Sequence, residues 1–136
     1  MNLTVTLPPI TSPFSAVQLQ KWRQVLLDLR REAVGDLDQM DAEELDTRDK
    51  AESDIDPLDA AVTSQTRDIA RNLAAHEQRL IRAIDTALVK IDIGMPVPFG
   101  ICELTGMPIE LPRLLLIPWT TVCSSGCRWA ERNRDR

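Results

Sequence analysis

The stretch Asp54-Ile55-Asp56-Pro57-Leu58-Asp59-Ala60-Ala61 decides the fold, because long helical patterns run into it from one side and away from it on the other. Pro57 fixes its own φ and lacks an N–H, so it suits the first position of a helix and pushes Asp56 out of the helical region. Asp56 is then the N-cap, and Asp59 can reach back as in a capping box. The stretch therefore predicts the turn of a helical hairpin.

This turn carries more acid than a helix cap needs. Three carboxylates, Asp54, Asp56 and Asp59, crowd it, and two small alanines follow. One acid is enough to cap the helix, so capping alone accounts for only part of the pattern. The second interpretation is a slim, acidic tip that enters a narrow cavity holding positive charge or a metal ion.

Two apolar stripes flank the turn at helical spacing. The first consists of Leu19, Trp22, Leu26, Leu29, Ala33, Leu37 and Met40, and the second of Val62, Ile69, Leu73, His76, Leu80, Ile84, Leu88 and Ile91. His76 is expected to pack in the seam, since no acid, Cys or second His stands at helical spacing to pair with it. The sequence predicts a mainly α fold, with a long antiparallel coiled-coil hairpin over residues 14–93, a start near Ser12-Pro13 and a tip near 51–59.

The hairpin is expected to have a short lead-in and a small C-terminal module. Residues 1–13 contain proline and show no period, which predicts a flexible or loosely docked lead-in. The run Gly94-Met95-Pro96-Val97-Pro98-Phe99-Gly100 breaks the second helix and marks a module over residues 94–136. This module resembles a zinc finger and closes with a short helix after Thr120.

The three cysteines lie in this module as C-x2-T, from Cys102 to Thr105, and C-x3-C, from Cys123 to Cys127. A structural zinc site prefers four ligands in two C-x2-C turns, so Thr105 replaces a ligand and Cys127 lies one residue too far along. Three interpretations remain open: a metal-free fold, zinc on Cys102, Cys123 and Cys127 with an outside ligand or water, and a reactive thiol or disulfide pair. The metal-free core would consist of Leu104, Ile109, Leu111, Leu114, Leu116, Ile117 and Trp119.

Composition narrows the function classes. The chain has 136 residues, a net charge of −5, 4% aromatic residues and no Tyr, which favours helical construction and argues against a protein that grips nucleic acid by itself. No secretory signal is visible, and the apolar stretch Leu114–Ile117 is too short to span a bilayer, so we expect a cytoplasmic protein. No catalytic Ser/His/Asp or Cys/His set and no phosphate loop can be assembled, so an enzyme is disfavoured.

Two motifs resemble one family over roughly Leu19 to Arg132. Asp56-Pro57-Leu58-Asp59-Ala60-Ala61 resembles the D-x-x-D-x-A tip of the DksA/TraR family of transcription factors. The run Phe99-Gly100-Ile101-Cys102 is followed by Gly106, Pro108-Ile109, Arg113-Leu114, Pro118 and Cys123, which is similar to the zinc-finger module of that family. The resemblance implies a monomeric regulator of the stringent-response type that binds bacterial RNA polymerase through its secondary channel.

The resemblance further implies that the acidic tip approaches the polymerase catalytic centre and alters the stability of promoter complexes. It implies no direct binding to DNA or to a membrane. Asp56, Asp59 and Ala61 occupy the tip positions of the family. We expect these two aspartates to have different roles: Asp56 caps the helix and Asp59 acts on the polymerase.

The resemblance also has departures. Family members that bind ppGpp do so through basic residues, and this chain has Ala83, Ile117 and Cys127 at those positions, so ppGpp coupling is expected to be weak or absent. With a zinc ligand missing, no cofactor is expected to be required. Functions of a different kind are a coiled-coil adaptor that binds another protein, and a thiol-based redox sensor.

Overall fold

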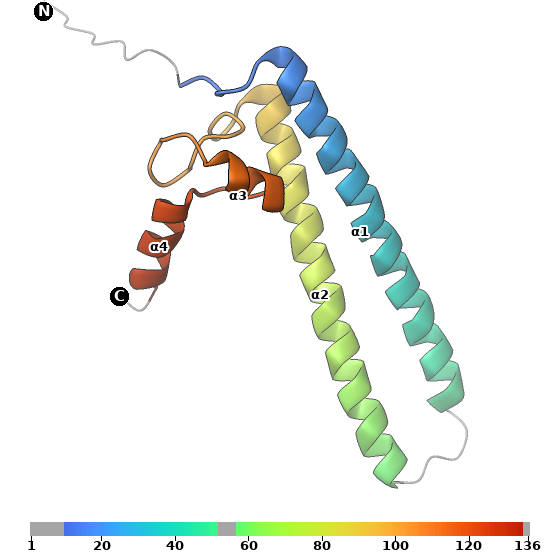
Figure 1. Cartoon of the computed structure of the whole chain (residues 1–136). Coiled ribbons are helices and arrows are strands. Elements are labelled where there is room, and N and C mark those ends of the chain that lie inside the picture. The colour runs from blue at the N-terminus through green and yellow to red at the C-terminus, as the bar shows by residue number, and fades with distance from the viewer. Residues whose placement is uncertain (1–9, 52–56, 135–136) are drawn as a thin grey trace, which may run out of the picture. The chain divides into compact units, whose positions relative to one another are not determined.

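The computed structural model describes the backbone of residues 10–51 and 57–134 and the side chains of residues 10–43 and 63–134. Within these ranges the chain forms α1 (Ala16–Ala51), α2 (Pro57–Ile93), α3 (Leu111–Leu116) and α4 (Ser124–Arg132) (Figure 1). The described residues contain no strand, and one isolated bridge pairs Ile101 with Pro108. None of the described helices combines the length and apolarity needed to cross a bilayer. The mainly α architecture predicted from the sequence is confirmed.

The two long helices run through two compact units. The hairpin unit is Leu27–Asp85, and the base unit combines Met1–Leu26 with Thr86–Arg136. The base unit holds the C-terminal module with α3 and α4, together with the first turns of α1 and the last turns of α2.

Ion pairs join α1 to α2 inside each unit. In the hairpin unit, Arg30 Nε lies 2.7 Å from Asp85 Oδ1, and in the base unit Arg23 Nε lies 3.2 Å from Asp92 Oδ1. Residues early in α1 therefore face residues late in α2, as an antiparallel hairpin requires. These side chains are 39–50% exposed, so the pairs fix the register more than they add stability.

Helix α1 begins at Ala16, which is later than the start near Ser12-Pro13 expected from the sequence. The Gln18 backbone N–H donates to Ser15 Oγ at 3.2 Å, and the Ser15 N–H donates to Gln18 Oε1 at 2.8 Å. This reciprocal pair is a capping box, which satisfies two N–H groups that the helix itself cannot. The motif Ser-x-x-Gln was the sequence signal for the true start.

The apolar stripe of α1 packs as predicted. Leu26 and Ala33 are buried. The other members, Leu19, Trp22, Leu29, Leu37 and Met40, are half-buried.

The predicted apolar stripe of α2 is only partly confirmed. Ile84 is fully buried and Leu80 is half-buried, but Ile69 and Leu73 are 61% and 51% exposed, and His76 is exposed as well. Successive four-residue steps turn around a helix by about 40° each, so residues linked by several such steps cannot all face one partner. In the part of α2 nearer the tip the half-buried positions are instead Thr63, Arg67, Ala74, Ala75 and Glu77. The expectation that His76 packs in the seam is therefore wrong.

Within the base unit, an aromatic cluster joins the segment before α1 to the C-terminal module. The ring centroids of Phe14 and Trp22 are 5.6 Å apart, and those of Trp22 and Phe99 are 5.7 Å apart. Ser12 Oγ donates to the Phe99 carbonyl oxygen at 2.6 Å. Gly100 has a φ of 90°, and a Cβ there would lie 2.8 Å from a Phe14 ring carbon, so this close approach requires glycine.

The predicted core of the module is partly confirmed. Ile109 and Leu114 are buried, whereas Leu104, Leu111 and Leu116 are 48%, 53% and 81% exposed. Ile117 and Trp119 are half-buried. Helix α3 has only six residues, so it turns one side towards the core, and Leu114 is its buried residue.

Candidate functional site

The tip turn lies between α1 and α2. Helix α1 ends at Ala51, and α2 begins at Pro57, the position that suits its fixed φ. Asp56 lies outside the described residues, and the side chains of Asp59 and Ala61, in the first turns of α2, lie outside them as well. The assignment of Asp56, Asp59 and Ala61 to a working tip therefore stays a prediction.

Four residues of the module form a second candidate site, which we name the knuckle cluster: Cys102, Thr105, Cys123 and Gly126. The Thr105 backbone N–H donates to Cys102 Sγ at 3.4 Å, and the Gly126 N–H donates to Cys123 Sγ at 3.3 Å. The Thr105 hydroxyl oxygen lies 3.6 Å from Cys123 Sγ and joins the two turns. Cys102 and Cys123 are both buried. Each cysteine thus begins a turn of the C-x2-C shape, with Thr105 and Gly126 at the second positions.

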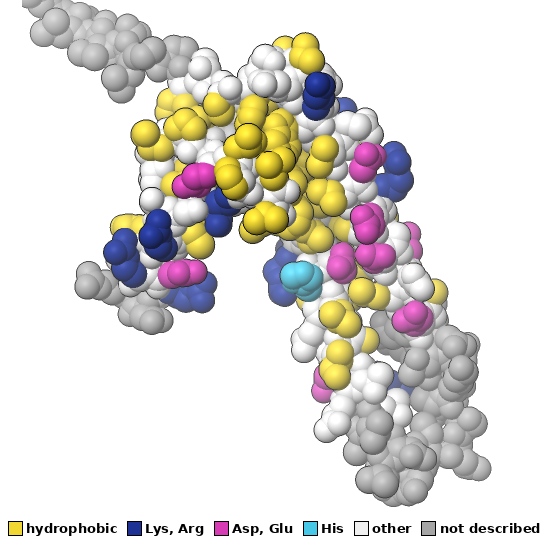
Figure 2. Space-filling view, in the orientation of Figure 1, with side chains coloured by type: hydrophobic (Ala, Val, Ile, Leu, Met, Phe, Trp, Pro, Cys, Tyr) yellow, Lys and Arg dark blue, Asp and Glu magenta, His cyan; other side chains and the backbone are white. Residues whose placement is uncertain are grey.

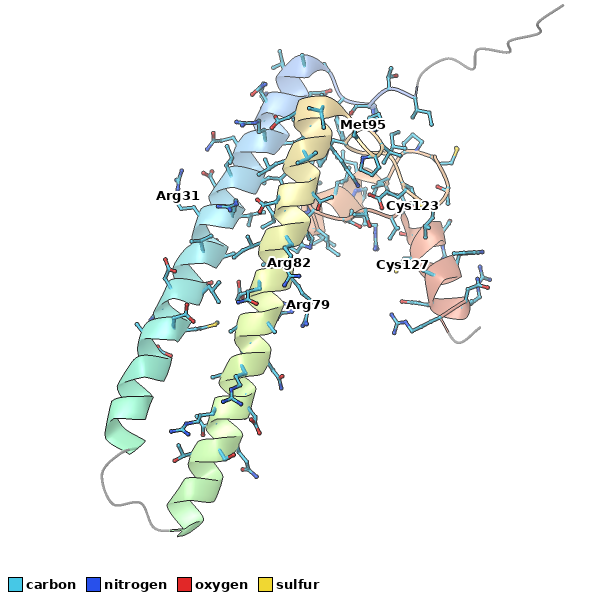
Figure 3. All side chains as sticks on the ribbon, turned by 180° about the vertical axis from the view of Figure 1, so that it is seen from behind. Arg31, Arg79, Arg82, Met95, Cys123 and Cys127 are labelled. Carbon is cyan, nitrogen blue, oxygen red and sulfur yellow. The ribbon has the colours of Figure 1, made fainter. Side chains whose placement is uncertain are left out.

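Cys127 lies apart from this cluster. Figure 3 shows Cys123 near the start of α4 and Cys127 within it, and Cys127 Sγ donates to Glu131 Oε1 at 3.7 Å. In the described part of the chain, no three His, Cys, Asp or Glu side chains gather in a metal-binding arrangement. The structure does not bring together Cys102, Cys123 and Cys127, the set of the zinc interpretation. The reason is that the third residue after Cys123 faces the cluster, and one further residue turns about 100° away around α4.

The knuckle cluster does not fit the zinc of the resembled module. Structural zinc takes four donors, and the cluster offers two thiols and one hydroxyl, which is a poor zinc ligand. A Cβ on Gly126 would lie 3.0 Å from Cys102 Sγ and 3.6 Å from Cys123 Sγ, so this position faces both sulfurs but supplies no donor. The C-x2-G spacing from Cys123 to Gly126 was the sequence signal for this turn, and the neighbouring Cys127 obscured it.

The surroundings of Cys102 favour its thiolate. Burial raises the pKa of the Cys102 thiol, but hydrogen bonds outweigh this effect and lower the pKa to about 7. The donors are the Thr105 side chain and the backbone N–H groups of Cys123, Thr105 and Leu104. Backbone donors and one hydroxyl therefore stabilise charge on this sulfur.

An ion pair with a buried lysine fixes Glu103, the residue next to Cys102. Lys90 is the only charged residue that is buried among those described, and its Nζ lies 2.6 Å from Glu103 Oε1. The Glu103 backbone N–H donates to the Thr121 carbonyl oxygen at 2.9 Å. Because an unpaired buried ammonium is costly, the pair holds the first knuckle turn against the end of α2. No sequence motif marks Lys90 or Glu103 as partners, because they are 13 positions apart in the chain and meet only in the fold.

A mainly apolar cavity lies in the base unit. It has a volume of about 390 Å³ and is lined by Phe14, Gln18, Lys21, Trp22, Val25, Leu111, Leu115 and Pro118. Leu115 and Leu116 are 66% and 81% exposed beside it, and Figure 2 shows hydrophobic side chains gathered over α3. Six of the eight lining residues are apolar, and Gln18 and Lys21 are the polar ones.

Comparison with known proteins decides the family. No family model matches the chain. A protein of Caulobacter vibrioides named RNA polymerase-binding transcription factor DksA is 33% identical over 119 residues, which cover 88% of this chain and 74% of that protein. The chain belongs to the DksA family. An uncharacterized protein of Aquifex aeolicus is 39% identical over 74 residues, and the match spans about half of each, 54% of this chain and 49% of that protein.

Solved structures of the DksA family agree with this assignment. The structure of transcription factor DksA2 from Pseudomonas aeruginosa has a TM-score of 0.73 and 30% identity and covers 88% of both chains. A Chlamydia trachomatis structure, described as an RNA polymerase binding protein and transcriptional regulator, has a TM-score of 0.53 at 20% identity and supports the fold alone. The resemblance and the fold class stated from the sequence are confirmed.

Proposed function

We propose that this protein is a transcription regulator that binds bacterial RNA polymerase and inserts its hairpin into the secondary channel. The observation that carries the proposal is the 33% identity over 119 residues to a protein named as an RNA polymerase-binding factor. The hairpin supports it, because α1 and α2 have 36 and 37 residues and ion pairs join them in an antiparallel register. This function would place the protein in the cytoplasm, where the polymerase is.

The proposed mechanism is electrostatic. Asp56 caps α2, and the Asp59 carboxylate approaches the magnesium-bearing active site of the polymerase, where Ala61 leaves the tip slim. A fixed carboxylate near a bound cation changes the potential around it and so the stability of nearby polymerase loops, without itself taking part in chemistry. The expected readout is a change in promoter-complex lifetime. Direct DNA binding is not part of the proposal, because the net charge is −5.

Two departures from the family belong to the same proposal. Ala83, Ile117 and Cys127 carry no positive charge, so we propose weak or absent coupling to ppGpp. The knuckle cluster has too few donors for zinc, so we propose a module that folds without it. A fold that needs no metal survives zinc starvation, which would suit a factor acting when zinc is scarce.

The substitution Asp59→Asn tests the tip. It keeps size and helix compatibility but removes the charge, so the variant should bind core polymerase like the wild type and lose its effect on a responsive ribosomal promoter. Asp41→Asn, on the exposed side of α1, is the matched control and should leave both properties unchanged. Unchanged transcription with the Asp59 variant would show that the tip has no such role.

A further inference from the structure

We propose that Cys102 and Cys123 together bind a soft, thiophilic monovalent cation, with copper(I) as the natural member of this class. The inference does not depend on polymerase binding. It rests on two buried thiols that converge in a donor set too small for zinc.

The two sulfurs face a common point. A Cβ built on Gly126 lies 3.0 Å from Cys102 Sγ and 3.6 Å from Cys123 Sγ, so both sulfurs are within 3.6 Å of a position where glycine has only hydrogen. Thr105 contacts both as well, with its N–H 3.4 Å from Cys102 Sγ and its hydroxyl oxygen 3.6 Å from Cys123 Sγ. Small side-chain rotations would bring both sulfurs to bonding distance from one ion.

Two thiolates suit a soft ion and not a zinc ion. Thiolate ligands select copper(I), which is satisfied by two sulfurs in a nearly linear arrangement, whereas zinc needs four ligands. Binding releases one proton from each thiol and leaves a copper bis-thiolate with one negative charge, and no atom is oxidised or reduced. The N–H donors of Thr105 and Gly126 point at the two sulfurs and would disperse this charge.

A cavity adjoins the knuckle cluster. The cavity has a volume of about 320 Å³, and Thr105 and Gly126 form part of its wall. Arg132 also lines it and brings a positive charge to the same side as the anionic complex. Cys127 Sγ donates to Glu131 and lies apart from the knuckle cluster, so Cys127 is the matched control thiol.

The test is an anaerobic titration of the reduced, full-length protein with copper(I) supplied from a coloured copper(I) chelator. Native mass spectrometry should show one copper per chain, and X-ray absorption should show two sulfur neighbours. Cys127→Ser should keep this stoichiometric binding, and Cys123→Ser should lose it. Far-ultraviolet circular dichroism and urea unfolding establish that each variant is folded.

A second variant, designed to bind copper(I) more tightly, tests the proposal even if Cys123→Ser fails to fold. Thr105→Cys adds a third thiol at a position already in contact with both sulfurs, so it should hold copper(I) against a higher chelator concentration than the wild type does. The proposal is overturned if the wild type takes up no copper, if Cys123→Ser folds and still binds it, or if Cys127→Ser releases it. Displacement of the copper by equimolar zinc would overturn it too.

Discussion

At the scale of single residues, Thr105 joins the two knuckle turns, because its backbone N–H donates to Cys102 Sγ and its hydroxyl lies close to both sulfurs. Hydrogen bonds that include its hydroxyl lower the pKa of Cys102 to about 7 despite burial. A depressed thiol pKa adds stability that is full above the pKa of the unfolded thiol and is lost as the pH falls through the folded value. The free energy of unfolding should therefore rise between about pH 7 and pH 9.

The variant Thr105→Val tests this cause. It removes the hydroxyl donor and keeps the shape, so the pKa of Cys102 should rise and the increase in stability between pH 7 and pH 9 should shrink. Urea unfolding under reducing conditions measures the stability, and thiolate absorbance measures the pKa. Thr11→Val, at an exposed position before α1, is the control. Equal pH dependence in wild type and Thr105→Val would contradict the assignment.

At the scale of elements, α2 shows where the seam runs. Ile84→Ala should destabilise the protein by about 2–5 kcal/mol, because Ile84 is fully buried and its truncation leaves a cavity. Ile69→Ala makes the same chemical change at a 61% exposed position and should cost within about 0.5 kcal/mol. Urea midpoints of the two variants give the comparison. Similar losses would mean that Ile69 belongs to the seam after all.

The knuckle turns are the second element that can be tested by design. Thr105→Cys combined with Gly126→Cys places four cysteines in C-x2-C pairs, so the double variant should bind one zinc per chain and gain stability from it. Elemental analysis and the absorption spectrum of the cobalt(II) form measure the site. Gly126→Ser in place of Gly126→Cys is the control and should not bind zinc. A double variant that folds without taking up zinc would show that the turns do not converge.

These elements also show what the sequence could predict. Pro57 and the run from Gly94 to Gly100 act locally, so both ends of α2 followed from the sequence. The exposure of Ile69 and His76 depends on how α2 winds past α1, which a single-helix pattern does not contain. Likewise, the approach of Gly126 to Cys102 joins residues far apart in the chain, so the spacing of the cysteines alone suggested Cys127 instead.

At the scale of the whole molecule, the central claim is that a DksA-family hairpin acts inside the polymerase rather than on DNA. The net charge of −5 argues against direct DNA binding, and the family assignment favours RNA polymerase as the partner. A coiled-coil adaptor for another protein would share the hairpin but would have no reason to compete for the secondary channel.

The most direct measurement is therefore competition for core RNA polymerase in the absence of DNA, with the labelled protein followed by fluorescence anisotropy. Our account predicts that the protein binds the polymerase and is displaced fully by a factor known to occupy the secondary channel. Failure to bind the core enzyme, or simultaneous binding of both factors, would contradict it.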